Sequence, residues 1–146
     1  MNKLNIFIAT PISGFDDENE YLQYRNAVLK MIGELRKEYI VFSEIENFTK
    51  LDLYDEPKKS ALKDFNMILK SDIFICMHPA KMQTSAMIEL GYALAHKKNI
   101  IIISHKNNLP FLALGMCDMA NNVKLIETSN IDNDTTNQLL SLIKKW

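Results

Sequence analysis

Glu89 is the charged side chain whose surroundings in the sequence most strongly suggest chemistry. It interrupts the run Ser-Ala-Met-Ile-Glu-Leu-Gly-Tyr-Ala-Leu-Ala at 85–95, which carries no other charge. A helix that is apolar on most sides is buried on most sides, and burying an unpaired carboxylate costs on the order of several kcal/mol. A helix N-terminus favours the ionised form of a nearby carboxyl group. Such a carboxylate can act as a nucleophile toward the anomeric carbon of a sugar.

Two plainer roles for Glu89 stay open. A capping box needs its glutamate at the third helical position, and with Thr84 or Ser85 as the cap that position is Met87 or Ile88. A glutamate at the rim of the fold could also simply face water. The functional interpretation therefore depends on the apolar character of the helix around Glu89.

Asp64 is the second candidate for chemistry, and Phe65 follows it in a predicted helix. Because that helix runs back toward the start of the sheet, its N-terminal half is expected near the edge where ligands bind. A carboxyl group there could hydrogen-bond or protonate a leaving group. The alternative is a solvated residue in a segment rich in lysine, with Lys58, Lys59 and Lys63 nearby.

The elements that must position these side chains alternate between apolar strands and helices. Strands are expected at 4–9, 39–42, 72–77, 99–104 and 122–127, helices at 20–38, 57–70, 85–96 and 131–146, and a loop at 44–55. The order also leaves room for a helix before the last strand. It predicts one α/β domain over 1–146: a five-stranded, mostly parallel sheet with helices on both faces, a flavodoxin- or Rossmann-like three-layer sandwich. In such sheets ligands bind beyond the carboxyl ends of the strands.

The segments that follow the predicted strands supply further candidate ligand-binding residues. The turn after the first strand is rich in hydroxyl groups, contains a glycine and could offer backbone N–H groups to a phosphate. Its candidate residues are Ala9, Thr10, Pro11, Ser13 and Gly14. Thr84 and Ser85 begin the helix after the third strand, where they could bind an anion or only cap the helix. His78 ends the third strand and could face the same site.

Composition excludes several classes of function. The 17 basic and 18 acidic residues give a net charge of −1, so neither a nucleic-acid polymer nor a membrane is an expected partner. Cys76 lies in an apolar run, where a small buried hydrophobic residue is expected, and two cysteines do not indicate a disulfide framework. Histidines and cysteines lack zinc spacing, so we expect no metal and no organic cofactor. The N-terminal apolar run is short for a signal peptide or membrane span, so the cytoplasm is the expected compartment.

Several blocks of the chain together resemble the nucleoside 2-deoxyribosyltransferase-like family. The blocks are Ile6–Pro11, Ser71–Ile75 with Asp64 eight residues before Asp72, and Glu89-Leu90-Gly91-Tyr92-Ala93. The resemblance runs over about residues 4–117. The segment Pro110-Phe111-Leu112-Ala113-Leu114-Gly115 looks like the branch that hydrolyses nucleoside 5′-monophosphates, in particular cytidine monophosphate.

This resemblance implies roles for individual residues. Glu89 would attack C1′ and form a glycosyl ester, and Asp64 would handle the base. The 110–116 segment, with Phe111, would lie near the interface of a homodimer and help complete the neighbouring site. Gln83 stands where the monophosphate branch has a phosphate-binding serine, and the family's usual residues also differ at Ile6, Ser13 and Ser85.

The sequence therefore predicts an enzyme that cleaves the N-glycosidic bond of a nucleoside 5′-monophosphate or nucleoside. Water as acceptor would make it a hydrolase, and a second base as acceptor would make it a transferase. The alternatives are a glycohydrolase of NAD, similar to TIR domains, and a nucleotide-binding regulatory module without turnover. The changes at Ile6, Gln83 and Ser85 motivate the last of these.

Overall fold

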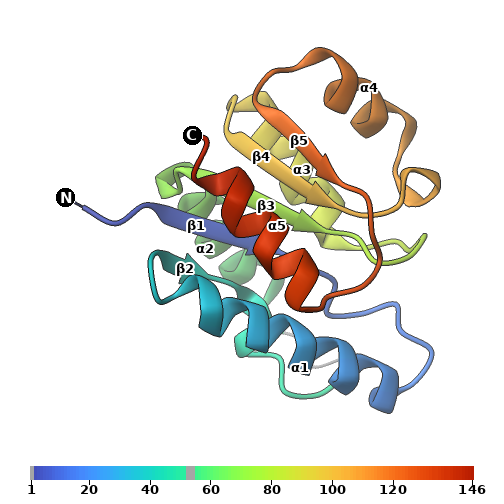
Figure 1. Cartoon of the computed structure of the whole chain (residues 1–146). Coiled ribbons are helices and arrows are strands. Elements are labelled where there is room, and N and C mark those ends of the chain that lie inside the picture. Colours follow the sequence, from blue (N-terminus) through green and yellow to red (C-terminus); the bar gives the residue numbers. More distant parts are fainter. Residues whose placement is uncertain (1, 52–54) are drawn as a thin grey trace.

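A computed structural model describes residues 2–51 and 55–146 of the chain. Residues 52–54, within the predicted loop 44–55, lie outside the described residues. The described residues form one parallel sheet in the order β2-β1-β3-β4-β5 (Figure 1). Its strands are β1 (Asn5–Ala9), β2 (Ile40–Phe42), β3 (Ile73–Met77), β4 (Asn99–Ile103) and β5 (Val123–Ile126). Each lies within a predicted strand, and every pairing is parallel, so the predicted architecture is confirmed.

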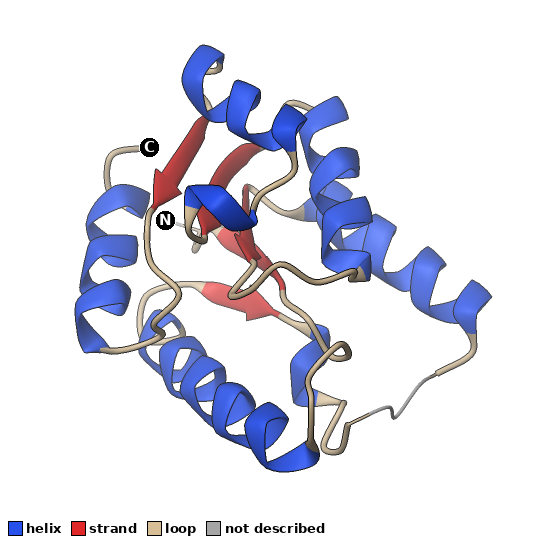
Figure 2. Ribbon diagram, turned by 90° about the vertical axis from the view of Figure 1, so that its right-hand side faces the viewer, coloured by secondary structure: helices blue, strands red, loops and turns tan. Residues whose placement is uncertain are grey.

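Helices cover both faces of the sheet, which gives three layers (Figures 1 and 2). On one face lie α1 (Glu18–Leu35) and α5 (Asn133–Ile143), and on the other lie α2 (Pro57–Lys70), α3 (Ser85–Ala95) and α4 (Phe111–Met119). Two short 3₁₀ helices, η1 (Glu44–Glu46) and η2 (Lys106–Asn108), follow β2 and β4. The polar loop predicted at 44–55 therefore begins with a helical turn.

Apolar runs form the central strands because both of their faces are buried. Successive side chains of a strand point to opposite faces, so Ile101 and Ile103 pack toward α1 and α5 while Ile100 and Ile102 pack toward α2, α3 and α4. All four isoleucines are at most 1% exposed. Cys76 is fully buried on β3 and packs in the second of these cores, as predicted.

Capping residues fix helix boundaries that apolar spacing alone misplaces. The predicted helix 20–38 begins at Glu18, because the Asp17 side chain accepts a hydrogen bond from the Glu20 N–H at 2.8 Å. It ends at Leu35, and β2 follows a short turn. The closing helix is shorter than 131–146 because Asp132 caps it, accepting from the Thr135 N–H at 2.9 Å.

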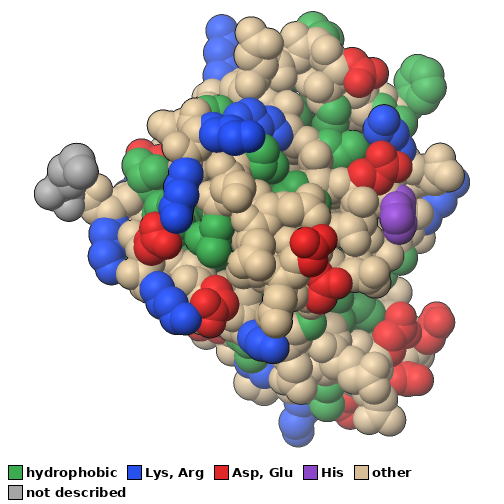
Figure 3. Space-filling view, viewed as in Figure 1, with side chains coloured by type: hydrophobic (Ala, Val, Ile, Leu, Met, Phe, Trp, Pro, Cys, Tyr) green, Lys and Arg blue, Asp and Glu red, His purple; other side chains and the backbone are tan. Residues whose placement is uncertain are grey.

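Strand order determines where a ligand site can form. β1 lies between β2 and β3, so the chain crosses to one side after β1 and to the other side after β3. Loops that leave neighbouring strands in opposite directions open a crevice at the carboxyl edge of the sheet. Across the described residues, no helix combines the length and the apolar character needed to cross a bilayer. Charges of both signs are spread over the face seen in Figure 3, with acidic side chains gathered over the start of α1.

Candidate active site

A cavity of about 380 Å³ opens at the carboxyl edge of the sheet, where the connections that follow β1 and β3 diverge. Its walls come from the turn after β1, from η1 after β2, from α2 and from the start of α3. This volume falls within the range of small-molecule sites, which is about 300–1,000 Å³. Asp64 and Glu89 both line the cavity, although they are far apart in the sequence.

Glu89 lies in the second turn of α3, which Thr84 caps by accepting a hydrogen bond from the Ala86 N–H at 3.3 Å. Its side chain is partly buried in the cavity wall. Burial, and then the negative charges of Asp64 and Glu44, raise the pKa of Glu89 to about 8. The expectation that the helix N-terminus keeps this group ionised is thus corrected, because the helix dipole acts mainly within the first turn and desolvation outweighs it.

Asp64 faces the same cavity from the middle of α2. Burial is the main cause that raises its pKa to about 7, and the neighbouring Glu44 adds to this by its charge and as a hydrogen-bond acceptor. Lys63 opposes the shift. The Oδ1 atom of Asp64 is buried and has no hydrogen-bond partner among the described residues. The cavity therefore holds two carboxyl groups with pKa values close to neutral pH, which suits acid–base chemistry.

Glu44 is a third carboxyl group of the cavity, and sequence analysis missed it. It begins η1 directly after β2, and its Oε1 atom lies 2.9 Å from Nζ of Lys63. The segment 44–55 has no strand or helix periodicity, so it gave no pattern signal. The rule that ligands bind beyond strand ends would have found Glu44, because it follows the predicted strand 39–42 more closely than Ser13 follows the first strand.

The turn after β1 contributes only part of its predicted residues to the cavity. Thr10 and Ser13 line it, and the Thr10 hydroxyl lies 2.5 Å from the Tyr24 hydroxyl of α1. Ala9 and Pro11 are buried and do not line it. Gly14 does not line it either. Its φ of +85° suits a glycine, and its Cα faces the backbone oxygen of Gln83 and the Met82 side chain.

Of the remaining residues predicted for the site, some line the cavity and others lie outside it. Ser85 lines the cavity, and Thr84 both lines it and caps α3. Gln83 is exposed outside it. His78 does not face the cavity: it is 2% exposed, and its Nε2 lies 3.1 Å from the carbonyl oxygen of Asn108. Burial lowers the pKa of His78, and the contact with Asn108 ties the end of β3 to η2. Phe111 is 88% exposed on α4 and lies outside the cavity of its own chain.

The charged residues that line the cavity are all acidic in the described part of the chain. They are Glu44, Asp55, Asp64 and Glu89. The lysines beside them are paired, Lys63 with Glu44 at 2.9 Å and Lys59 with Asp55 at 3.8 Å. Within residues 2–51 and 55–146, no group of three or more histidine, cysteine, aspartate or glutamate side chains is arranged to hold a metal ion.

No protein-family model matches the sequence, and neither does any curated protein. Solved structures do match. BlsM aligns with a TM-score of 0.77 at 19% identity, over 98% of this chain and 91% of its own. The CMP N-glycosidase BcmB of Clostridium botulinum aligns with a TM-score of 0.69 at 19% identity, over 94% and 98%. A conserved protein of Enterococcus faecalis V583 aligns with a TM-score of 0.61 at 16% identity, over 97% and 99%.

These similarities extend over almost the whole of each chain. They establish that the chain shares its fold with a CMP N-glycosidase and with BlsM, the nucleoside 2-deoxyribosyltransferase-like fold that the sequence resembles. At 16–19% identity the likeness concerns the fold, and the activity has to be argued from the cavity.

Proposed function

We propose that the chain cleaves the N-glycosidic bond of a nucleoside or nucleoside 5′-monophosphate, with Glu89 as nucleophile and Asp64 as acid–base group. The observation that carries this proposal is the presence of both carboxyl groups in one cavity at the carboxyl edge of the sheet, each with a raised pKa. The fold shared with the CMP N-glycosidase of C. botulinum supports the same reaction class.

The reaction would proceed in two steps. Ionised Glu89 forms a bond to C1′ while the C1′–N bond breaks, and the electron pair leaves with the base. Protonated Asp64 donates its proton to the departing base, which is therefore released neutral. A water molecule then adds hydroxide to C1′ and releases Glu89, while its other proton returns to Asp64. This is the double displacement of a retaining glycosidase, and it requires the single proton of the pair to be on Asp64 while Glu89 is ionised. Because the pKa of Glu89 is the higher of the two, the proton lies more often on Glu89, and the reactive form is the minor one.

The same glycosyl ester can react with a second base instead of water. Transfer would then give a new nucleoside, and hydrolysis would give the free sugar or sugar phosphate. The cavity is open to solvent on one side, since Ser85 and Ile88 on its wall are exposed. Water therefore has access to the ester, and hydrolysis is the outcome that we favour.

The negative charge of the cavity lining affects how well a substrate with a 5′-phosphate can bind and react. A phosphate dianion would lie among acidic side chains, and it would raise further the pKa of Glu89, which must ionise to act. Of the turn predicted to offer N–H groups to a phosphate, Pro11 and Gly14 do not line the cavity, while Thr10 and Ser13 do. We therefore expect the uncharged nucleoside to be the better substrate, although the segment 110–115 resembles the branch that hydrolyses monophosphates.

Two other functions would use the same cavity. A glycohydrolase of NAD would cleave a similar bond, but the acidic lining opposes a pyrophosphate for the same reason as a monophosphate. A binding module without turnover would be favoured if Glu89 were paired with a lysine. Instead the nearby Lys63 pairs with Glu44, and Glu89 faces the cavity together with Asp64.

A product assay tests the proposal. Wild-type protein and Glu89→Ala are incubated with nucleosides, their 5′-monophosphates and NAD, with and without a second free base, and released base is measured by chromatography. We expect release by the wild type and at least about 1,000-fold less by the variant, because the variant lacks the nucleophile. We expect kcat/KM for nucleosides to exceed that for monophosphates. Release from no substrate would contradict the proposal and leave a binding module.

A further inference from the structure

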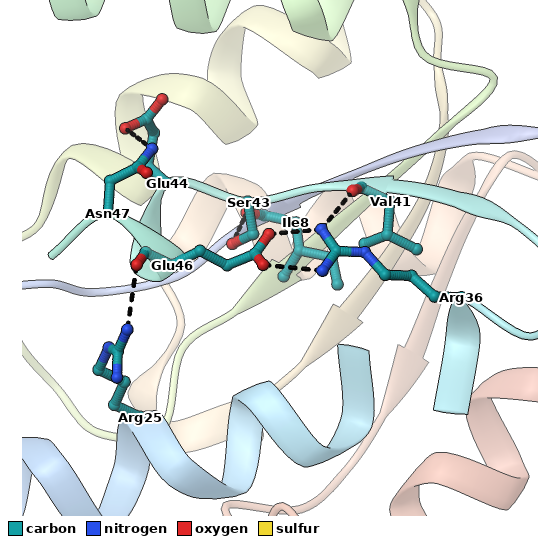
Figure 4. Close-up of polar contacts among 8 residues, drawn as sticks. All are labelled: Ile8, Arg25, Arg36, Val41, Ser43, Glu44, Glu46 and Asn47. Atoms are coloured by element: carbon teal, nitrogen blue, oxygen red, sulfur yellow. Dashed lines mark hydrogen bonds and ion pairs between the residues drawn. The ribbon is translucent and has the colours of Figure 1, made fainter. Parts of the chain in front are cut away.

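Glu44 is carried by a turn whose backbone is fixed by two arginines. Figure 4 shows the carboxylate of Glu46 bound by Arg36, with N–O distances of 2.5 and 2.7 Å. Arg25 donates to the carbonyl oxygens of Ile45 at 3.1 Å and Glu46 at 3.0 Å. These contacts hold η1 against α1, while the Glu44 side chain points away from Arg36 and lines the cavity (Figure 4). The position of the Glu44 carboxyl group is therefore determined by the fold.

Two carboxyl oxygens of the cavity are buried without a hydrogen-bond donor. They are Oε1 of Glu44 and Oδ1 of Asp64, and neither has a hydrogen-bond partner among the residues that the structure describes. Glu44 nevertheless lies within hydrogen-bonding reach of the Asp64 carboxyl group. Two carboxylates in this position would repel each other and leave buried oxygens unsatisfied, which is rare in folded proteins. A proton on one of the two groups supplies the missing donor and turns the contact into a hydrogen bond.

The surroundings of the two groups place this proton on Asp64. Nζ of Lys63 forms an ion pair with Oε1 of Glu44 at 2.9 Å, and the Asn47 amide donates to Oε2 of Glu44 at 3.4 Å. Both contacts favour the ionised form of Glu44. For Asp64, burial is the main cause that raises the pKa to about 7, Glu44 raises it further, and Lys63 opposes the shift. At and below neutral pH, Asp64 is therefore the donor and Glu44 the acceptor.

The other titratable groups that line the cavity do not take the place of Glu44. Asp55 reaches the cavity from the segment before α2, where it has an ion pair of its own, and it is not among the groups that shift the pKa of Asp64. Glu89 faces the cavity from α3. Burial, and then the charges of Asp64 and Glu44, raise the pKa of Glu89 to about 8. Glu89 must be ionised to attack C1′, so it cannot also hold the proton in the reactive form.

We infer that Glu44 and Asp64 share one proton, and that Glu44 is the positioning residue that keeps this proton on Asp64 between turnovers. The shared proton is a property of the folded protein, whereas its use as the acid of the first step rests on the proposed function. Because both side chains line the cavity, a base nitrogen that enters can replace Glu44 as the acceptor of the Asp64 O–H group.

Glu44 stays ionised through both steps of the proposed reaction. In the first step the O–H bond of Asp64 breaks, the base gains an N–H bond, and Asp64 becomes a carboxylate that faces the carboxylate of Glu44. This contact between like charges favours the return of a proton to Asp64, and the attacking water supplies that proton in the second step. Glu44 thus raises the fraction of the enzyme in the reactive form, with the proton on Asp64 and Glu89 ionised.

Glu44→Gln tests the inference through the pH dependence of base release from the nucleoside that the wild type cleaves best. The change removes a negative charge beside Asp64 and so lowers the pKa of Asp64. At about pH 8.5 Asp64 then loses its proton more often, and kcat/KM should fall about fivefold or more, the effect of a shift of about one pH unit. At about pH 5.5 Asp64 is protonated in both proteins and the ionisation of Glu89 limits the rate, so kcat/KM should stay within about twofold of the wild type.

A matched control separates proton placement from damage to the turn. Glu46→Gln makes the same substitution on the same turn, at a carboxylate that Arg36 binds and that is not part of the cavity lining. It should loosen η1 and leave the pH dependence of kcat/KM as it is in the wild type. A loss of activity in Glu44→Gln that is equal at both pH values, or the same pH-dependent loss in Glu46→Gln, would overturn the inference.

Carbon-13 NMR of the carboxyl groups in Glu89→Ala gives a readout that needs no turnover, because this variant lacks the nucleophile but keeps Asp64 and Glu44. Asp64 should titrate near its pKa of about 7. Adding Glu44→Gln should lower the titration midpoint by about half a pH unit or more. An unchanged midpoint would overturn the inference. A lowered midpoint together with no base release from any nucleoside would support the shared proton and overturn the proposed function.

Discussion

Two of the carboxyl groups in this cavity are held in an environment that opposes their ionisation. Asp64 and Glu89 are partly buried beside Glu44, and Lys63, whose positive charge opposes the pKa shift of Asp64, pairs with Glu44. Side chains arranged for folding alone would be expected to pair or to face water. Raised pKa values of this kind suit the proposed acid–base chemistry, and they lower the stability of the folded state at high pH.

Glu89→Gln should accordingly stabilise the protein at high pH. The pKa of Glu89 rises from 4.5 to about 8 on folding, so between these pH values the folded state binds more protons than the unfolded state. Stability of the wild type then falls as the pH rises through this range. The neutral glutamine removes that loss, and we expect a gain of about 1–2 kcal/mol at pH 8, less than the full shift implies because the side chain is only partly buried.

Urea unfolding at pH 4.5 and pH 8 measures this effect. The variant and the wild type should differ little at the lower pH and separate at the higher one. Glu34→Gln, a change at an exposed glutamate of α1 that pairs with Lys37, should follow the wild-type pH dependence. If Glu89→Gln shows the same fall in stability between the two pH values as the wild type, Glu89 is not the group that titrates.

The sequence singled out two carboxyl groups of the cavity, Glu89 and Asp64, and missed the third, Glu44. Glu89 was singled out because a single charge in an apolar helix is an anomaly. Asp64 was singled out because it follows the N-terminal half of the helix before the third strand, beside Phe65, and because its spacing from Asp72 resembles that of the family. Glu44 was missed because its neighbours 45–55 show no periodicity, and because the turn that carries it is held by Arg25 and Arg36, which are far away in the sequence. His78 lies outside the cavity that it was predicted to line. Its position at the end of a strand determines the edge of the sheet at which it lies, but not the direction in which its side chain points.

The start of α3 links the stability of an element to the geometry of the site. Thr84 accepts from the Ala86 N–H, and Glu89 follows one turn later. Asp132 plays the same capping role in α5, on the opposite face of the sheet and outside the cavity. Removing one cap or the other should therefore destabilise a helix beside the cavity or a helix far from it, at a similar cost in the free energy of unfolding.

Thr84→Val and Asp132→Ala should each lower the free energy of unfolding by about 1 kcal/mol, the usual cost of losing an N-cap. Thr84→Val should also lower base release about tenfold or more, since small displacements of a catalytic group are costly. Asp132→Ala should leave base release within about twofold of the wild type. Chemical denaturation and the product assay measure the two effects, and an equal loss of activity in both variants would mean that general destabilisation is the cause.

Predictions of whole elements succeeded where burial is strong. The isoleucine-rich β4 and the mixed apolar β3 are buried on both faces, so continuous apolar runs identified them. Element ends were less certain, because Asp17 and Asp132 determine them through single hydrogen bonds. The bounds of α4 were not predicted, since its apolar residues are not confined to one face and Phe111 and Leu112 at its start are exposed.

At the scale of the whole molecule, α4 exposes several large hydrophobic side chains, which a monomeric protein would rarely leave in contact with water. Phe111, Leu112 and Met119 are 88%, 84% and 77% exposed, and hydrophobic side chains stand out over α4 in Figure 3. Leu112 and Met119 lie seven residues apart and share one face of the helix. Because α4 connects the end of β4 to the start of β5, Phe111 lies toward the same edge of the sheet as the cavity.

We propose that a second copy of the chain covers this face of α4, with the 110–116 segment beside the cavity of its partner. Sedimentation equilibrium should then give a dimer for the wild type and a monomer for Phe111→Asp, because a buried charge at the contact has no partner. Leu62→Asp, at a leucine of α2 that is 65% exposed, is the matched control and should remain dimeric.

If Phe111 also borders the neighbouring cavity, base release by Phe111→Asp should fall at protein concentrations where Leu62→Asp is fully active. A wild type that stays monomeric at all concentrations would contradict the dimer, and a monomeric variant with full activity would show that each cavity works alone.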